Sequence, residues 1–170
     1  MMDRFILRAQ LRAVLPEGVV LHASSVAQND SASIFLAMSG GGKSTIMGRL
    51  ARERYGAIAD DSVVIARGTD GVVRSLPCGS MKQNMGTEKI DGAVLKTIYF
   101  VEKGSPGFRY RISPEYAFYR AVNLSSIMAF GNIQPEEQKQ AVSFLRELFR
   151  SFPAYMIRYG LQEELRTIIS

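Results

Sequence analysis

Residues 37–45, with the sequence AMSGGGKST, combine three consecutive glycines with a lysine and two hydroxyl side chains. Glycines let a backbone turn tightly and let phosphate oxygens approach its N–H groups. From such a loop Lys43 can reach the terminal phosphates of a nucleotide, and the Ser44 hydroxyl can ligate Mg²⁺. The alternative is a glycine turn that only connects a strand to a helix. We predict nucleotide binding through Ser39, Gly40, Gly41, Gly42, Lys43, Ser44 and Thr45.

Two adjacent carboxylates, Asp60 and Asp61, follow a short apolar segment and lie within twenty residues of the lysine. Nucleotide-binding loops of this kind need a second anchor for the metal, usually an acidic residue at the end of another strand. One carboxylate can hold Mg²⁺ while the other accepts a proton from an attacking hydroxyl. The alternative is that both acids only turn the chain. We predict that Asp60 and Asp61 together supply a metal partner and a proton acceptor.

His22 is the only histidine of the chain and lies among apolar residues, directly before the segment that leads into the glycines. Side chains alternate between the two faces of a strand, so Leu21 is expected to face the core and His22 the opposite side. Ligands of such sheets bind outside the carboxyl ends of the strands. We therefore expect an imidazole nitrogen near an anion bound in the loop. A buried or edge histidine without a catalytic role is the alternative.

The elements that must position these residues alternate between apolar strand patterns and amphipathic helix patterns, which predicts an α/β fold. An Asp-Gly turn is expected at residues 69–71, and a surface loop, which is also a candidate lip for a substrate, at residues 78–92. Ser113, Pro114 and Glu115 indicate a helix start. Helices are predicted over residues 4–15, 43–54, 114–129, 135–151 and 162–169. Strands are predicted over residues 18–28, 31–38, 72–77, 93–103, 108–113 and 153–159, with two more flanking the aspartates within residues 55–68. We expect a single domain, residues 1–170, with a mixed sheet and flanking helices.

Composition excludes several classes of protein. The chain of 170 residues is 46% hydrophobic and 22% charged, as globular proteins are. Its one cysteine, Cys78, cannot form a disulfide framework within the chain, and no apolar run reaches the ~20 residues of a membrane span. The net charge of +5 suits an anionic ligand but is too dispersed to indicate nucleic acid. The start lacks a signal cleavage site, so we expect a cytoplasmic protein with no membrane and no nucleic-acid partner.

The order of His22, the segment AMSGGGKS and the segment ADD resembles the catalytic domain of HPr kinase/phosphorylase. That family carries a histidine on the strand before a Gly-x-Ser-Gly-x-Gly-Lys-Ser loop and a pair of aspartates after the next helix. Ser39 and Gly40 match the Ser-Gly inside that loop. The resemblance implies a P-loop kinase fold akin to phosphoenolpyruvate carboxykinase and Mg·ATP-dependent phosphorylation of a serine hydroxyl.

Carried over residue by residue, the resemblance gives Lys43 and Ser44 the phosphates and the metal. It makes Asp61 the proton acceptor, which leaves Asp60 as the metal partner, and it places His22 near the transferred phosphoryl group. Thr45 stands where the family commonly has glutamate, and the family's Glu-x-Arg-Gly signature has no counterpart here.

The segments LHASSV and FPAYMIRYGLQEEL look more like the short stand-alone relatives of HPr kinase, which include peptide-modifying kinases. We expect an ATP- and Mg²⁺-dependent kinase that phosphorylates a serine-type hydroxyl on a peptide or small protein. Two alternatives stay open: a small-molecule kinase, and a nucleotide-binding regulatory protein without transferase activity. A carboxykinase is disfavoured because the chain is short. A reverse dephosphorylation and a homo-oligomeric state are left open.

Overall fold

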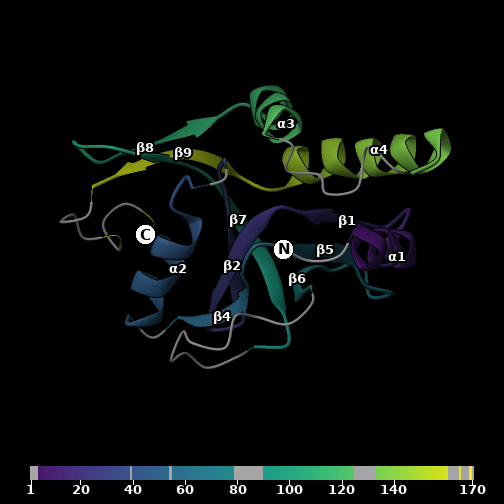
Figure 1. Ribbon diagram of the computed structural model, residues 1–170, viewed down its shortest axis with the longest axis horizontal. Coiled ribbons are helices and arrows are strands. Elements are labelled where there is room, and N and C mark those ends of the chain that lie inside the picture. Colours follow the sequence, from purple (N-terminus) through teal and green to yellow (C-terminus); the bar gives the residue numbers. More distant parts are fainter. Residues whose placement is uncertain are drawn as a thin grey trace.

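The computed structural model describes residues 4–38, 40–53, 55–78, 90–124, 133–160, 165 and 169. Helices lie on both sides of a twisted sheet (Figure 1). In chain order the elements are α1 (Arg4–Val14), β1 (Gly18–Leu21), β2 (Ala23–Gln28), β3 (Ser31–Leu36), α2 (Lys43–Ala51), β4 (Gly56–Ala59), β5 (Val63–Arg67), β6 (Val73–Pro77), β7 (Ala93–Lys103), β8 (Phe108–Ile112), α3 (Pro114–Asn123), α4 (Pro135–Ser151) and β9 (Ala154–Tyr159).

The α/β alternation predicted from the sequence is confirmed, and the bounds of β7 and α4 are those expected. Some predicted elements are shorter in the structure: α1 ends at Val14, β3 at Leu36 and α2 at Ala51. Helix α3 ends at Asn123, where the sequence allowed a break, and residues 125–129 of the predicted helix lie outside the described residues. The single strand expected over residues 18–28 is divided at His22 into β1 and β2. The loop at residues 79–89 and most of the helix predicted over residues 162–169 lie outside the described residues.

The described strands form one mixed sheet of nine strands. Its path is β1-β5-β6-β7-β3-β2-β4, and β9 joins β7 while β8 joins β9. The β3–β7 and β7–β9 pairs are parallel, and the other pairs are antiparallel. Because β3, β7 and β9 run in the same direction, their carboxyl ends lie at one edge of the sheet.

The division at His22 has a topological cause. Strand β1 pairs with β5 up to Leu21 and Val63, whereas β2 pairs with β4 from Ser25 and Ala59 onward. Between these two ladders, the chain at residues 22–24 passes the chain at residues 60–62 without a ladder between them. The sheet bends there from one set of partners to the other. At this bend His22, Asp60 and Asp61 lie outside the strand ladders and are only partly buried.

Alternate residues of the central strands face two separate cores. On β7, Ile98 and Phe100 face a core shared with β1, β5, α3 and α4, whereas Tyr99 and Val101 face a core shared with α2. On β3, Ile34 and Phe35 divide in the same way. This alternation is the period of two that strands impose. A central sheet buried on both faces follows, with α2 on one side and α3 and α4 on the other.

Local signals fix the ends of α3 and α4. The Ser113 hydroxyl accepts a hydrogen bond from the Tyr116 N–H (3.2 Å), and Pro114 begins α3, as predicted. At the start of α4, the Glu137 carboxylate accepts from the Gln134 N–H at 2.8 Å. Arg12 of α1 also binds Glu137 (2.6 Å), which ties α1 to α4.

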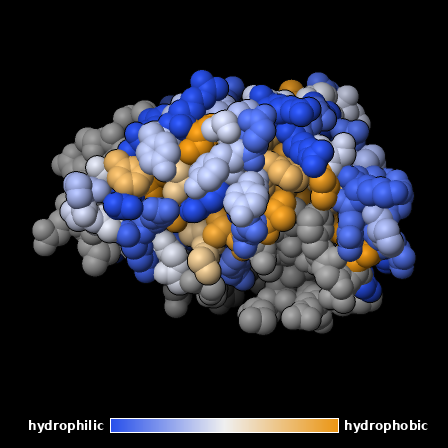
Figure 2. Space-filling view, turned by 90° about the horizontal axis from the view of Figure 1, so that it is seen from above, coloured by the Kyte–Doolittle hydropathy of each residue, from blue (hydrophilic) through white to orange (hydrophobic). Residues whose placement is uncertain are grey.

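The outer face of α3 and β8 carries exposed aromatic side chains, Tyr110, Tyr116 and Tyr119. Seen from this side, hydrophobic residues are interspersed among hydrophilic ones and do not form one continuous patch (Figure 2). Within the part of the chain that the structure describes, no helix has the length and apolar character to cross a bilayer.

Candidate active site

A cavity of about 360 Å³ opens where α2 begins, at the edge formed by the carboxyl ends of β3 and β7. Its lining includes every residue that the sequence predicted for the site except Ser39, which lies outside the described residues. The lining adds one residue that was not predicted, Lys103 at the end of β7. Residues from four separate segments of the chain thus meet in one place.

The glycine loop (residues 37–42) turns sharply into α2. The Gly41 N–H donates to the Met38 carbonyl at 2.8 Å, and a Cβ atom at Gly41 would lie only 2.7 Å from the Ala37 Cβ. Gly42 has a φ of +97°, a conformation that residues with side chains rarely adopt. The first N–H groups of α2 have no partner within the helix and carry its positive end toward the cavity. This is the local geometry that anions favour.

Lys43 is held tightly in the cavity wall. Its ammonium donates to the Ala37 carbonyl (2.9 Å) and the Met38 carbonyl (3.3 Å), and it contacts His22 Nε2 at 3.1 Å. The side chain is 7% exposed. Burial lowers the pKa of Lys43, and the negative charges of Asp61 and Asp60 act in the opposite direction.

Asp60 is bound to two serine hydroxyls, one from each side. The Ser44 hydroxyl, in the first turn of α2, donates to Asp60 Oδ1 at 3.0 Å, and the fully buried Ser24 hydroxyl donates to the same oxygen at 2.9 Å. The carboxylate of Asp60 is thereby fixed beside the hydroxyl predicted to ligate a metal. Hydroxyl and carboxylate oxygens are the donors that Mg²⁺ prefers. Among the described residues, no group of three or more His, Cys, Asp or Glu side chains gathers to hold a metal.

His22 bridges the lysine and the second aspartate. An ammonium can only donate, so Nε2 accepts from Lys43 and the proton lies on Nδ1. Nδ1 then donates to the Asp61 carbonyl at 2.7 Å and lies 3.3 Å from its Oδ1. Asp61 has a φ of +78°, which is uncommon for a residue with a side chain. The carboxylate is 46% exposed and can therefore meet a substrate.

Comparisons with known proteins agree with this fold. No protein-family model matches the sequence, and no curated protein matches it. Among solved structures, the HPr(Ser) kinase/phosphatase from Coxiella burnetii superposes with a TM-score of 0.51. The identity is 9%, over 87% of this chain and 84% of that chain. The similarity is one of fold. The chain therefore shares the fold of that protein, a relationship that the resemblance in the sequence also implied.

Three site residues were missed by the sequence reasoning. Ser24 lies two positions after His22, and the strand period alone could have placed both on one face. Lys103 and Tyr159 end two neighbouring parallel strands, and no local pattern reveals that these strands are adjacent. The Tyr159 hydroxyl donates to the Gly42 carbonyl at 3.0 Å and so helps to hold the glycine loop in place.

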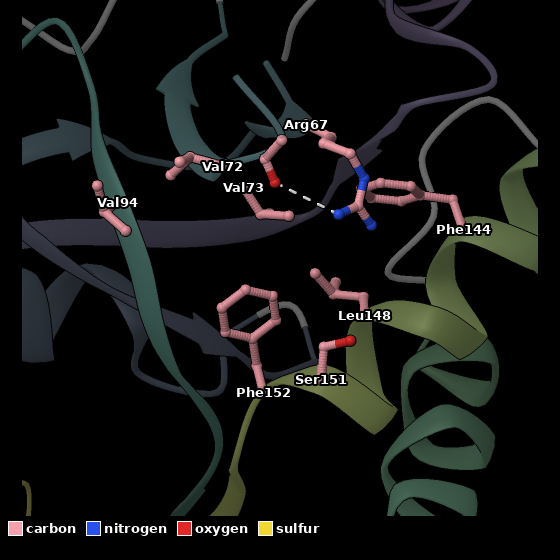
Figure 3. A pocket seen from close by; sticks show the side chains of 9 residues that line it. Arg67, Val72, Val73, Val94, Phe144, Leu148, Ser151 and Phe152 are labelled. Atoms are coloured by element: carbon pink, nitrogen blue, oxygen red, sulfur yellow. Dashed lines mark hydrogen bonds between the residues drawn. The ribbon is translucent and has the colours of Figure 1, made fainter. Parts of the chain in front are cut away.

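A second cavity, of about 240 Å³, lies between the β5–β6 hairpin and the end of α4. Figure 3 shows its mostly apolar lining, including Val73, Phe144 and Leu148, with Arg67 at the rim. The Arg67 guanidinium is occupied by Glu17 and Glu147. None of the residues predicted to do chemistry reaches this cavity. The candidate site is therefore the cavity at the glycine loop.

Proposed function

We propose that the chain is an Mg·ATP-dependent kinase that transfers a phosphoryl group to a serine-type hydroxyl on a peptide or small protein. One observation carries the proposal: two interactions occur in a single cavity. The Ser44 hydroxyl donates to Asp60, and Asp61 lies beside the hydrogen-bonded pair of His22 and Lys43. A phosphate-binding loop, a metal partner and a base are the parts that phosphoryl transfer requires. The kinase-like fold supports the same reading.

The donor set at the loop fits a hard cation bound with phosphates. Ser44 and Asp60 would hold Mg²⁺, directly or through water, and Ser24 would keep the Asp60 carboxylate in place. Bound Mg²⁺ would offset negative charge on the phosphates. The backbone N–H groups at the start of α2 and the Lys43 ammonium would orient the same phosphates.

Asp61 would accept the proton of the acceptor hydroxyl. Its carboxylate is partly exposed, unlike the buried Lys43, so an incoming hydroxyl can reach it. His22 would act as a positioning residue, because Nδ1 holds the Asp61 backbone and Nε2 accepts from Lys43. Catalysis would then rest mostly on orientation and electrostatic stabilisation.

Two criteria separate this proposal from its alternatives: the chemical class of the phosphate acceptor, and whether function depends on Asp61. A small-molecule kinase would use the same residues with a different acceptor. A nucleotide-binding regulatory protein needs only the glycine loop, so the loss of Asp61 would leave its function intact.

The test is phosphoryl transfer from γ-labelled ATP with Mg²⁺ to peptides that contain one serine in varied surroundings. Free serine and glycerol serve as small acceptors, and mass spectrometry identifies the product. We expect a phosphoserine peptide with the wild type. Asp61→Asn should bind Mg·ATP as the wild type does in calorimetry but lose transfer by about a hundred-fold or more.

The matched control is Asp91→Asn, which removes an exposed carboxylate that does not line the cavity. It should leave transfer unchanged. Phosphorylation of the small acceptors alone would replace the peptide kinase by a small-molecule kinase. ATP binding with no transfer to any acceptor, and with no effect of Asp61→Asn, would support the regulatory protein instead.

A further inference from the structure

Lys43 has no hydrogen-bond donor left for a ligand in this structure. An ammonium carries three donors. All three are engaged, by the Ala37 carbonyl, the Met38 carbonyl and His22 Nε2. A phosphate entering the cavity must therefore displace one of these bonds or be met by a different cation.

Lys103 is the other cation that lines the cavity, and its ammonium is not engaged in the way that the Lys43 ammonium is. The side chain is exposed and lines the cavity, and within the described part of the chain no carboxylate pairs with it. The neighbouring Glu102 binds Arg120 (3.5 Å) and Arg158 (3.3 Å) instead. Successive residues of a strand point to opposite faces, so Glu102 lies on the α3 side of β7 and Lys103 on the α2 side.

The stem of Lys103 is packed against the glycine loop. A Cβ atom built on Gly42 would lie 3.0 Å from Lys103 Cε and 2.4 Å from the Tyr159 hydroxyl. Lys103 and Tyr159 are register partners at the ends of β7 and β9. The β7–β9 ladder therefore fixes where the lysine stem runs, and the stem brings the ammonium to the N-terminus of α2.

Lys103 adds positive charge at the end of the cavity where α2 begins. The start of α2 is a region of positive potential, which favours anions over cations. Lys103 adds a full positive charge beside it, and the Asp60 and Asp61 side chains contact Ser44 and His22 rather than Lys103. An anion would therefore be attracted to this end of the cavity.

We propose that Lys103 binds the phosphates of the nucleotide, as a second cation beside Lys43. The inference rests on the proposed function, since it concerns the same cavity. Lys43 shapes the loop through its bonds to the Ala37 and Met38 carbonyls, and Lys103 supplies a cation that is free to meet the ligand. The ligand class is a polyphosphate whose charge extends from the loop toward the end of β7.

The test is calorimetric binding of ATP, ADP and inorganic pyrophosphate to the wild type, Lys103→Gln and Lys103→Arg. We expect Lys103→Gln to weaken ATP binding by about ten-fold or more, as the loss of one charge-assisted hydrogen bond predicts. Its affinity should also depend less steeply on salt concentration. Lys103→Arg should recover most of the affinity, and the melting temperature without ligand should stay near that of the wild type.

The matched control is Lys96→Gln, the same change at an exposed lysine of the same strand, outside the cavity. Equal ATP affinity and equal salt dependence in Lys103→Gln and the wild type would overturn the inference while leaving the proposed kinase intact. An equal loss in Lys96→Gln would also overturn it, because net charge alone would then explain the effect. A wild type that binds none of the three probes would refute the proposed function and this inference together.

Discussion

His22 and Asp60 each hydrogen-bond to two other residues of the site. His22 was expected to face a bound anion, yet both of its ring nitrogens are occupied, one by the Asp61 carbonyl and one by Lys43. The histidine therefore helps to set the positions of Asp61 and Lys43. Asp60 likewise is held from two sides by serine hydroxyls, so its carboxylate has little freedom to move.

His22→Ala should lower the rate of transfer by about ten-fold or more while changing the KM for ATP much less. The reason is that Asp61 loses the contact that holds its uncommon backbone conformation, whereas the nucleotide keeps the loop and Lys43. Steady-state kinetics measure both quantities. His22→Gln, whose amide can both donate and accept, should restore part of the rate. An unchanged rate in a well-folded His22→Ala protein would show that the contacts are incidental.

Asp60→Asn should raise the Mg²⁺ concentration needed for tight ATP binding, by about ten-fold or more, because a charged metal partner becomes neutral. The amide oxygen can still accept from Ser24 and Ser44, so the fold should hold. Calorimetry at several Mg²⁺ concentrations measures the effect. A loss of affinity that is the same with and without Mg²⁺ would assign Asp60 a structural role only.

At the scale of elements, the site depends on how α2 meets the ends of β7 and β9. Tyr159 of β9 donates to the Gly42 carbonyl, and the same carbonyl accepts the Ile46 N–H of α2 at 2.9 Å. Arg49 on the next turn donates to the Gly160 carbonyl at 3.2 Å. The loop is therefore clamped between a helix and a strand end rather than standing free.

Gly42→Ala should destabilise the protein by about 1–3 kcal/mol and weaken ATP binding, because the new Cβ meets the Tyr159 hydroxyl and the backbone φ is positive. Gly48→Ala is the matched control, since this helical glycine has open space where a Cβ would go. It should stabilise the protein by about 0.5–1 kcal/mol. Chemical denaturation measures both. Equal stability of the two variants would refute the clamp.

At the scale of the whole molecule, the core that lies on the α3 and α4 side of the sheet encloses groups far from the site. Cys78, after β6, is 6% exposed, and its thiol donates to Gln10 Oε1 of α1 at 2.7 Å. Burial raises the pKa of Cys78 from 9.0 to about 11. The folded protein thus keeps a proton that the unfolded chain loses first as the pH rises.

Stability should consequently fall as the pH rises from about 9 toward 11, because the folded state binds more protons in this window. The thiol's full contribution is present below about pH 9 and amounts to about 2–3 kcal/mol at most.

Urea denaturation across this range, compared with Cys78→Ala, measures it. The variant should show a shallower fall than the wild type. The pKa values of Tyr99 and Tyr159, which burial raises from 10.0, lower stability from about pH 10 upward in both proteins, so they cancel in the comparison. If the free energy of unfolding fell equally steeply with pH in the two proteins, the raised pKa of Cys78 would be refuted.

Local chemistry in the sequence determined a large part of the protein. Glycines followed by Lys43 and Ser44 located the loop and the start of α2, and the cap at Ser113 located the start of α3. The apolar runs located β3 and β7, and the paired aspartates pointed to the correct strand end. These features depend on residues close together in the chain, whose spacing reflects helix and strand periods directly.

Only the tertiary structure decided which segments meet. The apolar pattern of residues 18–28 is continuous, yet the chain bends at His22 because β1 pairs with β5 and β2 with β3 and β4. Lys103 is separated from Gly42 by some sixty residues and reaches it through the parallel pairing of β7 with β3, the strand that leads into the glycine loop. Strand pairing between distant segments is chosen by packing over the whole sheet, and no period in the sequence records it.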